Sequence, residues 1–365
     1  MKNRLWIIGI VLAVGLTSGG SEGAVNSSGH VAAIEAGEKS AHGSSDGISA
    51  KVNISFATSI TTDGTNLYVV DTNDHVIQKI VISTGEVSTF AGLSGVSGES
   101  DGYGSGALFN NPQGITTDRT NLYIADTGNC TIRKIALATG EVSTLAGTAG
   151  KCNSVDGTGA AAQFGAPHGI TTDKTYLYVA DIKNNAVRKV SISTGAVTTL
   201  RDFTKTSASS DASSKVTGLN LATEITTDGT NLYLADNGGQ TIRQMALETG
   251  KVTTLAGTVG AIGSTDGSGS VAQFGAINGI TISGSSLYVA DTYNGTIRKI
   301  IISNGQVSTL AGTAGTFGFD DGVRTEARFD LVSGITTDGA NLYCMNNGNN
   351  SIRKIAIATG KVTTL

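Results

Sequence analysis

Two side chains of this sequence, His168 and Glu224, are of the types that move protons in enzymes. An imidazole and a carboxyl group that share one water molecule can serve as general base and general acid. The alternative is that His168 is an isolated polar side chain on a solvated surface. Because the two residues are far apart in the sequence, only the fold can bring them together.

Metal and cofactor chemistry has little support in the residue types. The sequence contains 4 His and 3 Cys, which are too few and too scattered for a recognisable zinc site. Asp followed by Gly recurs in a pattern that resembles the start of a calcium loop, but the later oxygen ligands and the closing Glu are missing. The leading interpretation therefore assigns no metal, no cofactor and no catalytic residue.

The composition is that of a chain with many strands and tight turns. It contains 50 Gly and 2 Pro, with recurrent Val, Ile, Thr and Tyr and no long helical period. The formal net charge is −4, and removal of the first twenty residues, which include Lys2 and Arg4, would make it −6 (−4 minus 2). An acidic chain disfavours nucleic-acid binding, which relies on a face rich in Lys and Arg.

The first residues have the layout of a secretory signal peptide. Lys2 and Arg4 precede the apolar run Leu5–Leu16, and small residues follow it. This run is shorter than the roughly 20 residues that span a bilayer, so we expect cleavage and no membrane span in the mature chain. We predict a signal peptide over residues 1–24, a linker over 25–45 and a periplasmic or extracellular product.

A 55-residue repeat organises the rest of the chain. An offset of 55 places six isoleucines in one column without insertion or deletion: Ile60, Ile115, Ile170, Ile225, Ile280 and Ile335. In the second copy, extended segments at 114–118, 121–126, 131–137 and 141–147 are separated by gaps of two to four residues, which suit antiparallel hairpins. Each repeat is therefore predicted to be a four-stranded meander.

Six such sheets must stack on one another to bury both faces. We predict an all-β, six-bladed β-propeller over residues 46–365, with four antiparallel strands per blade. A linear solenoid would need polar caps at both ends, and the first and last copies are as apolar as the others. The sequence leaves open how the ring closes.

The segments PQGITTDRTNLYIADTGNCTIRKI (112–135) and PHGITTDKTYLYVADIKNNAVRKV (167–190) resemble NHL repeats. The resemblance covers 46–365 and implies a propeller of the NHL-repeat family, which we expect to be an exported, bacterial member. It implies a sensor domain, a protein or RNA platform or, less often, a lyase or hydrolase. Lyases and lactonases of propeller form hold a metal in the channel with several His or acidic residues, and here only His168 and Glu224 are offered there.

Residues that recur in every copy are expected to belong to the scaffold. We expect the Asp residues that end the second strands, such as Asp126, to cap the following turn. We expect the Arg seven positions later, such as Arg133, to pair with Asp between blades.

Residues that break the repeat are the candidates for ligand binding. Those at the mouth of the predicted channel and in the turns after the second strands are Gln113, His168, Glu224, Asn278, His75, Lys183, Gln240 and Tyr293. Connections of about 20 residues between blades are expected on the same face, and long loops of this kind are usually functional. The alternative is a solvated rim that drifted after duplication.

Three functions remain open. The leading hypothesis is a monomeric binding or scaffolding module that recognises a cell-envelope or extracellular protein, peptide or glycan through this face. The second is a channel-sited, metal-dependent hydrolase or lyase that uses His168 and Glu224. The third is a purely structural repeat protein.

The cysteines and the connection 201–224 are the remaining departures from the repeat. Cys130 and Cys152 fall on one face of one blade, so we predict a disulfide between them in an oxidising compartment. Cys344 lies inside a strand and is expected to be a buried thiol. The connection 201–224, with Lys205 and Lys215, departs most from the repeat and is interpreted as a partner-specific or flexible loop.

Overall fold

The structure, a computed structural model, describes residues 47–48, 54, 56–204 and 222–365. The chain divides into two compact units, Met1–Ala41 and His42–Leu365, and every described residue belongs to the second. The predicted signal peptide (1–24) and linker (25–45), as well as Lys205 and Lys215, lie outside the described residues. None of the helices in the described part of the chain has the length and apolar character of a membrane span.

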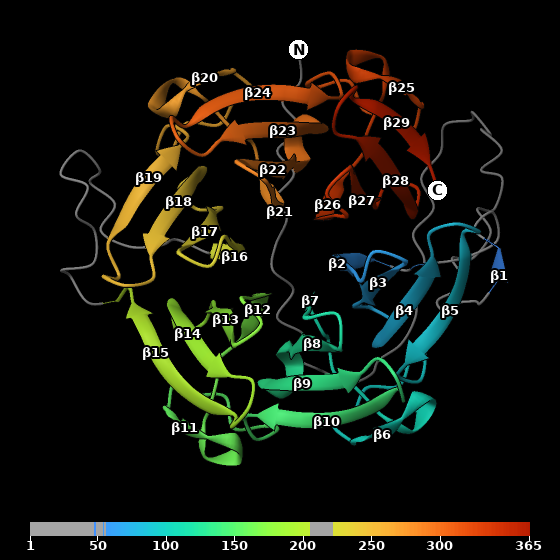
Figure 1. Ribbon diagram of the computed structural model, residues 1–365, viewed down its shortest axis with the longest axis vertical. Helices are drawn as coiled ribbons and strands as arrows, with labels where there is room; N and C mark the ends of the chain where they lie inside the picture. Colours follow the sequence, from blue (N-terminus) through green and yellow to red (C-terminus); the bar gives the residue numbers. More distant parts are fainter. Residues whose placement is uncertain (1–46, 49–53, 55, 205–221) are drawn as a thin grey trace, which may run out of the picture. The chain divides into compact units, whose positions relative to one another are not determined.

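Six antiparallel sheets are arranged around a central axis (Figure 1). The strands of blades 1 to 3, from the axis outward, are β2 (Ala57–Thr62), β3 (Asn66–Asp71), β4 (Val76–Val81) and β5 (Glu86–Ala91); β7 (Gly114–Thr117), β8 (Asn121–Asp126), β9 (Thr131–Ala136) and β10 (Glu141–Ala146); and β12 (Pro167–Thr172), β13 (Tyr176–Asp181), β14 (Ala186–Ser191) and β15 (Ala196–Asp202). Those of blades 4 to 6 are β16 (Ala222–Thr227), β17 (Asn231–Asp236), β18 (Thr241–Ala246) and β19 (Val252–Ala256); β21 (Ile277–Ser283), β22 (Ser286–Asp291), β23 (Thr296–Ile301) and β24 (Gln306–Ala311); and β26 (Val332–Thr337), β27 (Asn341–Asn346), β28 (Ser351–Ala356) and β29 (Lys361–Thr364). The predicted fold, an all-β six-bladed propeller, is confirmed.

Five of the six sheets carry an additional short strand on the outer edge, which the sequence did not predict. These two-residue strands are β1 (Gly47–Ile48), β6 (Gly102–Tyr103), β11 (Gly157–Thr158), β20 (Gly267–Ser268) and β25 (Gly322–Val323). Each pairs with the start of the fourth strand of the same blade, and in β6, β11, β20 and β25 a 3-10 turn follows. The turns are η2 (Gly104–Gly106), η4 (Gly159–Ala161), η5 (Gly269–Val271) and η7 (Arg324–Glu326). In blade 4 the equivalent positions lie outside the described residues.

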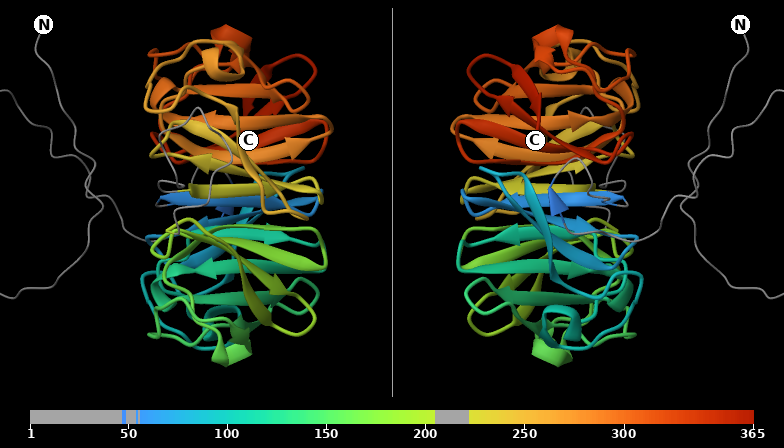
Figure 2. Two further views of the ribbon diagram at one scale, coloured as in Figure 1. Left: turned by 90° about the vertical axis from the view of Figure 1, so that its left-hand side faces the viewer. Right: turned by 90° about the vertical axis from the view of Figure 1, so that its right-hand side faces the viewer.

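Strand alternation supplies the packing between blades. Tyr68 and Val70 of blade 1 pack against Leu122 and Ile124 of blade 2, and the other interfaces repeat this arrangement. Burial of each such side chain contributes about 1.5–3 kcal/mol to folding. Figure 2 shows the blades from the edge of the ring, with loops emerging on both faces.

The ring closes by the same face-to-face packing. Tyr343 and Met345 of blade 6 share a buried cluster with Ile60 and Leu67 of blade 1. The Ser333 hydroxyl donates a hydrogen bond of 3.1 Å to the Ala57 carbonyl across this interface. Every described strand pairs only within its own blade, so no strand is shared between blades 1 and 6.

In blades 2, 3, 5 and 6 a buried arginine anchors the incoming long connection to its blade. The guanidinium of Arg298 binds Asp291 Oδ2 at 2.8 Å, Asp266 Oδ1 at 2.6 Å and the carbonyls of Thr265 and Gln273. It also lies 5.2 Å from the centre of the Phe274 ring. The expectation that these arginines pair between blades is therefore wrong, because Asp291 and Arg298 lie on adjacent strands of one sheet.

The Asp that recurs at the end of the second strand has hydrogen-bond partners beyond those predicted. Asp126, Asp181 and Asp291 accept backbone N–H groups from the preceding connection, namely those of Asn110, Gly165 and Gly275. Within the part of the chain that the structure describes, a backbone bond from the following turn to this Asp is made in blade 4, from Gly239 to Asp236. The buried carboxylate thus holds the start of its own blade as well as the turn after it, from which the side-chain amides of Asn129, Asn184 and Asn294 donate to the same three Asp residues.

Replacing Arg298 with Ala should lower the free energy of unfolding by about 3–5 kcal/mol, because Asp291 then stays buried without its cation. Burial already raises the pKa of Asp291, so the carboxylate depends on its hydrogen bonds and on Arg298. Chemical denaturation of the wild type and the variant measures this difference.

The matched control is Asp291→Asn. Blade 6 carries Asn346 at this position beside Arg353, and Asn346 Oδ1 still accepts the Asp330 N–H at 2.8 Å. The control should therefore cost about 1 kcal/mol. Equal losses for the two variants would contradict the anchoring role of the arginine.

Candidate functional site

One face of the ring, which we call the loop face, carries the long connections and the turns after the second strands. The first turn of a connection hydrogen-bonds to the turn of the blade it leaves: Gly95 N–H to Asp74 O at 3.0 Å and Gly315 N–H to Asn294 O at 3.1 Å. The opposite face carries the turns after the first and third strands. There, Asp118 accepts the N–H groups of Thr120 and Asn121 and the hydroxyl of Tyr123.

The innermost strands are sheet edges, so their backbone groups need partners from outside the sheet. Side chains at the mouth of the channel supply several of them. Thr58 Oγ1 donates to Gln113 O at 2.8 Å, and His168 Nδ1 lies 2.8 Å from Thr223 O. Part of the predicted binding rim is therefore used to connect neighbouring blades.

A second set of links joins the end of each second strand to the next blade. Thr72 and Thr292 donate to the carbonyls of Pro112 and Val332, while Asn237 accepts the Ile277 N–H. Blade 3 has Ile182 at this position, whose side chain has no hydrogen-bonding group. The interface between blades 3 and 4 thus lacks the link from the end of the second strand, and the contact of His168 Nδ1 with Thr223 O joins the two blades there.

His168 and Glu224 meet at this interface. His168 Nδ1 and Glu224 Oε1 are 3.9 Å apart, and the two side chains are 22% and 11% exposed. A carbonyl can only accept a hydrogen bond, so Nδ1 carries a proton toward Thr223 O and Nε2 is left as an acceptor. The predicted proximity of this pair is present in the structure.

Glu224 occupies a column that is Gly in four of the other five blades. At Gly169 the inner strands come so close that a Cβ atom would lie 2.5 Å from Thr223 O. A carboxyl group forced into this space is poorly solvated, and burial raises the pKa of Glu224 to about 8. Burial also lowers the pKa of His168 to about 4, so both groups are neutral at pH 7.

Asn278 is connected to the same cluster. Asn237 Nδ2 donates to Thr223 Oγ1 at 2.8 Å and to Asn278 Oδ1 at 3.3 Å. We call His168, Thr223, Glu224, Asn237 and Asn278 the channel cluster. Sequence analysis did not find Asn237, although the repeat contains the signal, since three of its equivalents are Thr.

Most of the other predicted site residues lie apart from this cluster, and Gln240 is hydrogen-bonded to it through Asn237. Gln113 is half-buried in blade 2, and His75 accepts the Asn111 N–H at 3.1 Å in a left-handed turn position. Burial lowers the pKa of His75. Gln240 donates to Asn237 O at 2.6 Å, whereas Lys183 and Tyr293 are exposed. All lie on the loop face but do not form one site.

A channel metal of the kind held by propeller lyases does not fit this donor set. Among the residues that the structure describes, no group of three His, Cys, Asp or Glu side chains is placed to bind a metal ion. His168 and Glu224 alone would leave most of a coordination sphere to solvent. No chemistry through a metal is derived for this chain.

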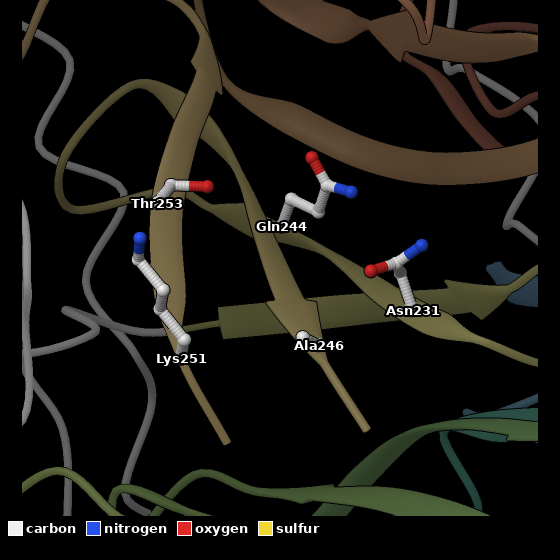
Figure 3. Close-up of a pocket in the computed structure, with 5 residues that line it drawn as sticks. All are labelled: Asn231, Gln244, Ala246, Lys251 and Thr253. Carbon is white, nitrogen blue, oxygen red and sulfur yellow. The ribbon is translucent and has the colours of Figure 1, made fainter. Parts of the chain in front are cut away.

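A shallow depression lies elsewhere, on blade 4 (Figure 3). Asn231, Gln244, Ala246, Lys251 and Thr253 line it, from β17, β18, β19 and the turn before β19. No predicted site residue belongs to it.

Cys130 and Cys152 form a disulfide in the structure, with their Cα atoms 5.4 Å apart. It joins the turn after the second strand of blade 2 to the connection that leaves that blade. Cys344 is a buried free thiol, and burial raises its pKa to about 12.

Glu224→Gln should remove a pH dependence of stability. The folded pKa of about 8 is above the ordinary 4.5, so the folded state binds more protons between these values and wild-type stability falls as pH rises through this window. The variant should be more stable than the wild type at pH 8, on the order of 3 kcal/mol. Unfolding in denaturant at several pH values measures this.

The control for that experiment is His168→Gln, the residue of blade 2 at this position. The folded pKa of His168, about 4, is below the ordinary 6.5, so His168 makes stability rise with pH over that range. In the control, only the rise of stability with pH between about 4 and 6.5 should disappear, and the fall of stability above that range should remain. Identical profiles for the wild type and Glu224→Gln would contradict the burial of this carboxyl group.

Comparison with known proteins supports the repeat assignment. No protein-family model matches the chain. It is 28% identical over 336 residues to the human NHL repeat-containing protein 2, covering 82% of this chain and 46% of that protein, so it spans about half of that relative's length. A Bacteroides thetaiotaomicron structural genomics protein of unknown function has the same fold, with a TM-score of 0.67, 20% identity and coverage of 86% and 72% of the two chains. An auxiliary nutrient binding protein from the same organism matches with a TM-score of 0.61, 17% identity and coverage of 86% and 70%. The six repeats folded as six blades and the likeness to NHL repeat-containing protein 2 support an NHL-repeat β-propeller family for this chain.

Proposed function

We propose that this propeller is a binding or scaffolding module that recognises a protein, peptide or glycan through its loop face. One observation carries the proposal: the recurring charged residues satisfy one another inside the blades, while the residues that break the repeat gather on the loop face. A binding role also agrees with the name of the auxiliary nutrient binding protein that shares the fold.

A second candidate is proton-transfer chemistry in the channel, favoured by the 3.9 Å separation of His168 and Glu224. Neutral Glu224 can donate a proton and His168 Nε2 can accept one, which is the pairing that a hydrolase or lyase needs. Turnover of a small substrate that is lost in His168→Gln would favour this candidate.

We further propose that the protein acts outside the cytoplasm as a monomer. The leader-like residues 1–24 and the disulfide support this location. The mature protein isolated from cells should have a mass that corresponds to cleavage between Gly19 and Ala24. Non-reducing peptide mapping should find Cys130 linked to Cys152. An uncleaved protein with free thiols in the cytoplasmic fraction would contradict the proposal.

Blocking one face at a time tests the binding function. Lys183 is exposed on the loop face and Lys251 on the opposite face. Each is changed to Cys and coupled to a bulky polyethylene glycol; among the described residues the other cysteines are bonded or buried. The probes are envelope extract and a glycan array. The Lys183→Cys conjugate should lose at least tenfold in retained ligand, and the Lys251→Cys conjugate should bind like the wild type.

The opposite pattern, or equal binding by both conjugates, would contradict a loop-face site. Absence of any retained ligand in the wild type would favour a purely structural role. Thermal unfolding of both conjugates checks that the ring is intact.

A further inference from the structure

Several exposed large apolar side chains lie in one sector of the loop face. Five of them are 44–69% exposed and come from the connections on either side of blade 5 and from its turn: Ile262, Tyr293, Phe317, Phe319 and Leu331. Exposed apolar residues that are scattered singly need no explanation, but a contiguous group marks an interaction surface.

These side chains lie on blade 5 and on the connections beside it. Ile262 is bridged to Phe274, and a Cβ atom on the next residue, Gly275, would lie 2.8 Å from Tyr293 Cβ. Tyr293 belongs to the turn η6 (Thr292–Asn294), and the following Gly295 lies against the Phe317 ring, which a Cβ there would meet at 3.1 Å.

Leu331 completes the arc at blade 6. The Asn347 N–H donates to Leu331 O at 3.3 Å, and Thr292 Oγ1 donates to the carbonyl of the next residue, Val332, at 2.6 Å. We call these five residues the aromatic arc.

The other repeats show that the scaffold does not require these residues. Where the arc has Phe317, other copies have Ser97 and Cys152; where it has Phe319, they have Ser154 and Ser264. Leu331 has a φ of +52°, a left-handed conformation that disfavours a side chain with a Cβ, and is still exposed. An apolar side chain kept exposed on an unfavourable backbone is better explained by a contact outside the ring than by the fold.

Acidic side chains flank the arc. Asp320 is exposed, and Asp330 lies over the turn of blade 6, where a Cβ atom on Gly348 would meet its Oδ2 at 2.5 Å. The equivalent positions carry Thr265 and Gly275 in blade 5. The neighbouring cation, Arg328, donates to Thr313 Oγ1 at 3.4 Å and to Ala327 O at 2.8 Å, so its guanidinium is directed to the connection itself. The borders of the arc therefore favour a cationic partner group.

We propose that the aromatic arc binds an extended segment of a partner protein that carries apolar side chains next to Lys or Arg. The inference rests on the proposed loop-face function and deepens it. Apolar side chains of the segment would cover the arc, and its basic groups would face Asp320 and Asp330. A glycan fits less well, because Ile262 and Leu331 offer no flat ring on which a sugar can stack.

The test uses a phage-displayed library of random linear peptides, selected on the intact protein. The arc variant combines Tyr293→Asn with Phe317→Ser, which are the residues of blade 1 at these positions (Asn73 and Ser97). Enriched peptides should contain apolar residues and Lys or Arg, and their affinity should fall at least tenfold on the arc variant. A charge variant, Asp320→Thr with Asp330→Asn, should reduce affinity and its dependence on salt.

The control is the channel variant His168→Gln with Glu224→Gly, which should bind the peptides like the wild type. Thermal unfolding shows whether each variant is folded. Peptides that lose affinity on the channel variant and not on the arc variant would overturn the arc and leave the loop-face function standing. No peptide that depends on the arc, arc-dependent binding to a glycan array instead, or an arc-dependent dimer in sedimentation would each overturn the proposal.

Discussion

The loop face depends on the buried guanidinium groups. In blades 2, 3 and 5 one arginine connects the end of the second strand, two carbonyls of the incoming connection and the Asp that precedes the outermost short strand. In blade 6, Arg353 connects the two carbonyls and the Asp. A connection of this length has no regular structure of its own to order it. The arginine donates hydrogen bonds to the backbone carbonyls and to the Asp of the connection. The connection therefore has a defined surface that can recognise a ligand.

The same arrangement explains which features the sequence could predict. The isoleucine column and the short gaps determine the meander and the propeller, because alternation and hairpin geometry act locally. The outermost strands could not be found from two residues without an apolar pattern. For Asp126 only the following turn was predicted as a partner, and the Asn110 N–H was missed because it reaches this carboxylate only when the incoming connection is in place.

Prediction of the site succeeded where the repeat placed residues at the same level of neighbouring blades, as for His168 and Glu224. It failed where the search was restricted to polar breaks in the repeat. Phe317 and Phe319 break the repeat as clearly, but an apolar residue in a connection is normally interpreted as part of the core, and only the structure shows that these two are exposed. Phe317 and Gly295 stand in the columns that Cys152 and Cys130 occupy in blade 2, so the repeat places an exposed aromatic ring in one connection where it places a disulfide in another.

Closure without a shared strand has a consequence for local opening of the ring. A propeller that exchanges a strand between its first and last blades has one reinforced junction, so it opens locally at one of the other junctions. Among the described residues no strand is shared at any of the six junctions, so the side chains at each junction decide which of them separates first. At the junction of blades 3 and 4, Ile182 replaces a side chain that could form a polar link. The neutral side chains of His168 and Glu224 lie 3.9 Å apart there, and Glu224 occupies a column that is Gly in four other blades. Amide hydrogen exchange in the inner strands β12 and β16 should therefore be faster than in the inner strands at the other junctions. The most mobile part of the channel wall would then lie beside His168 and Glu224.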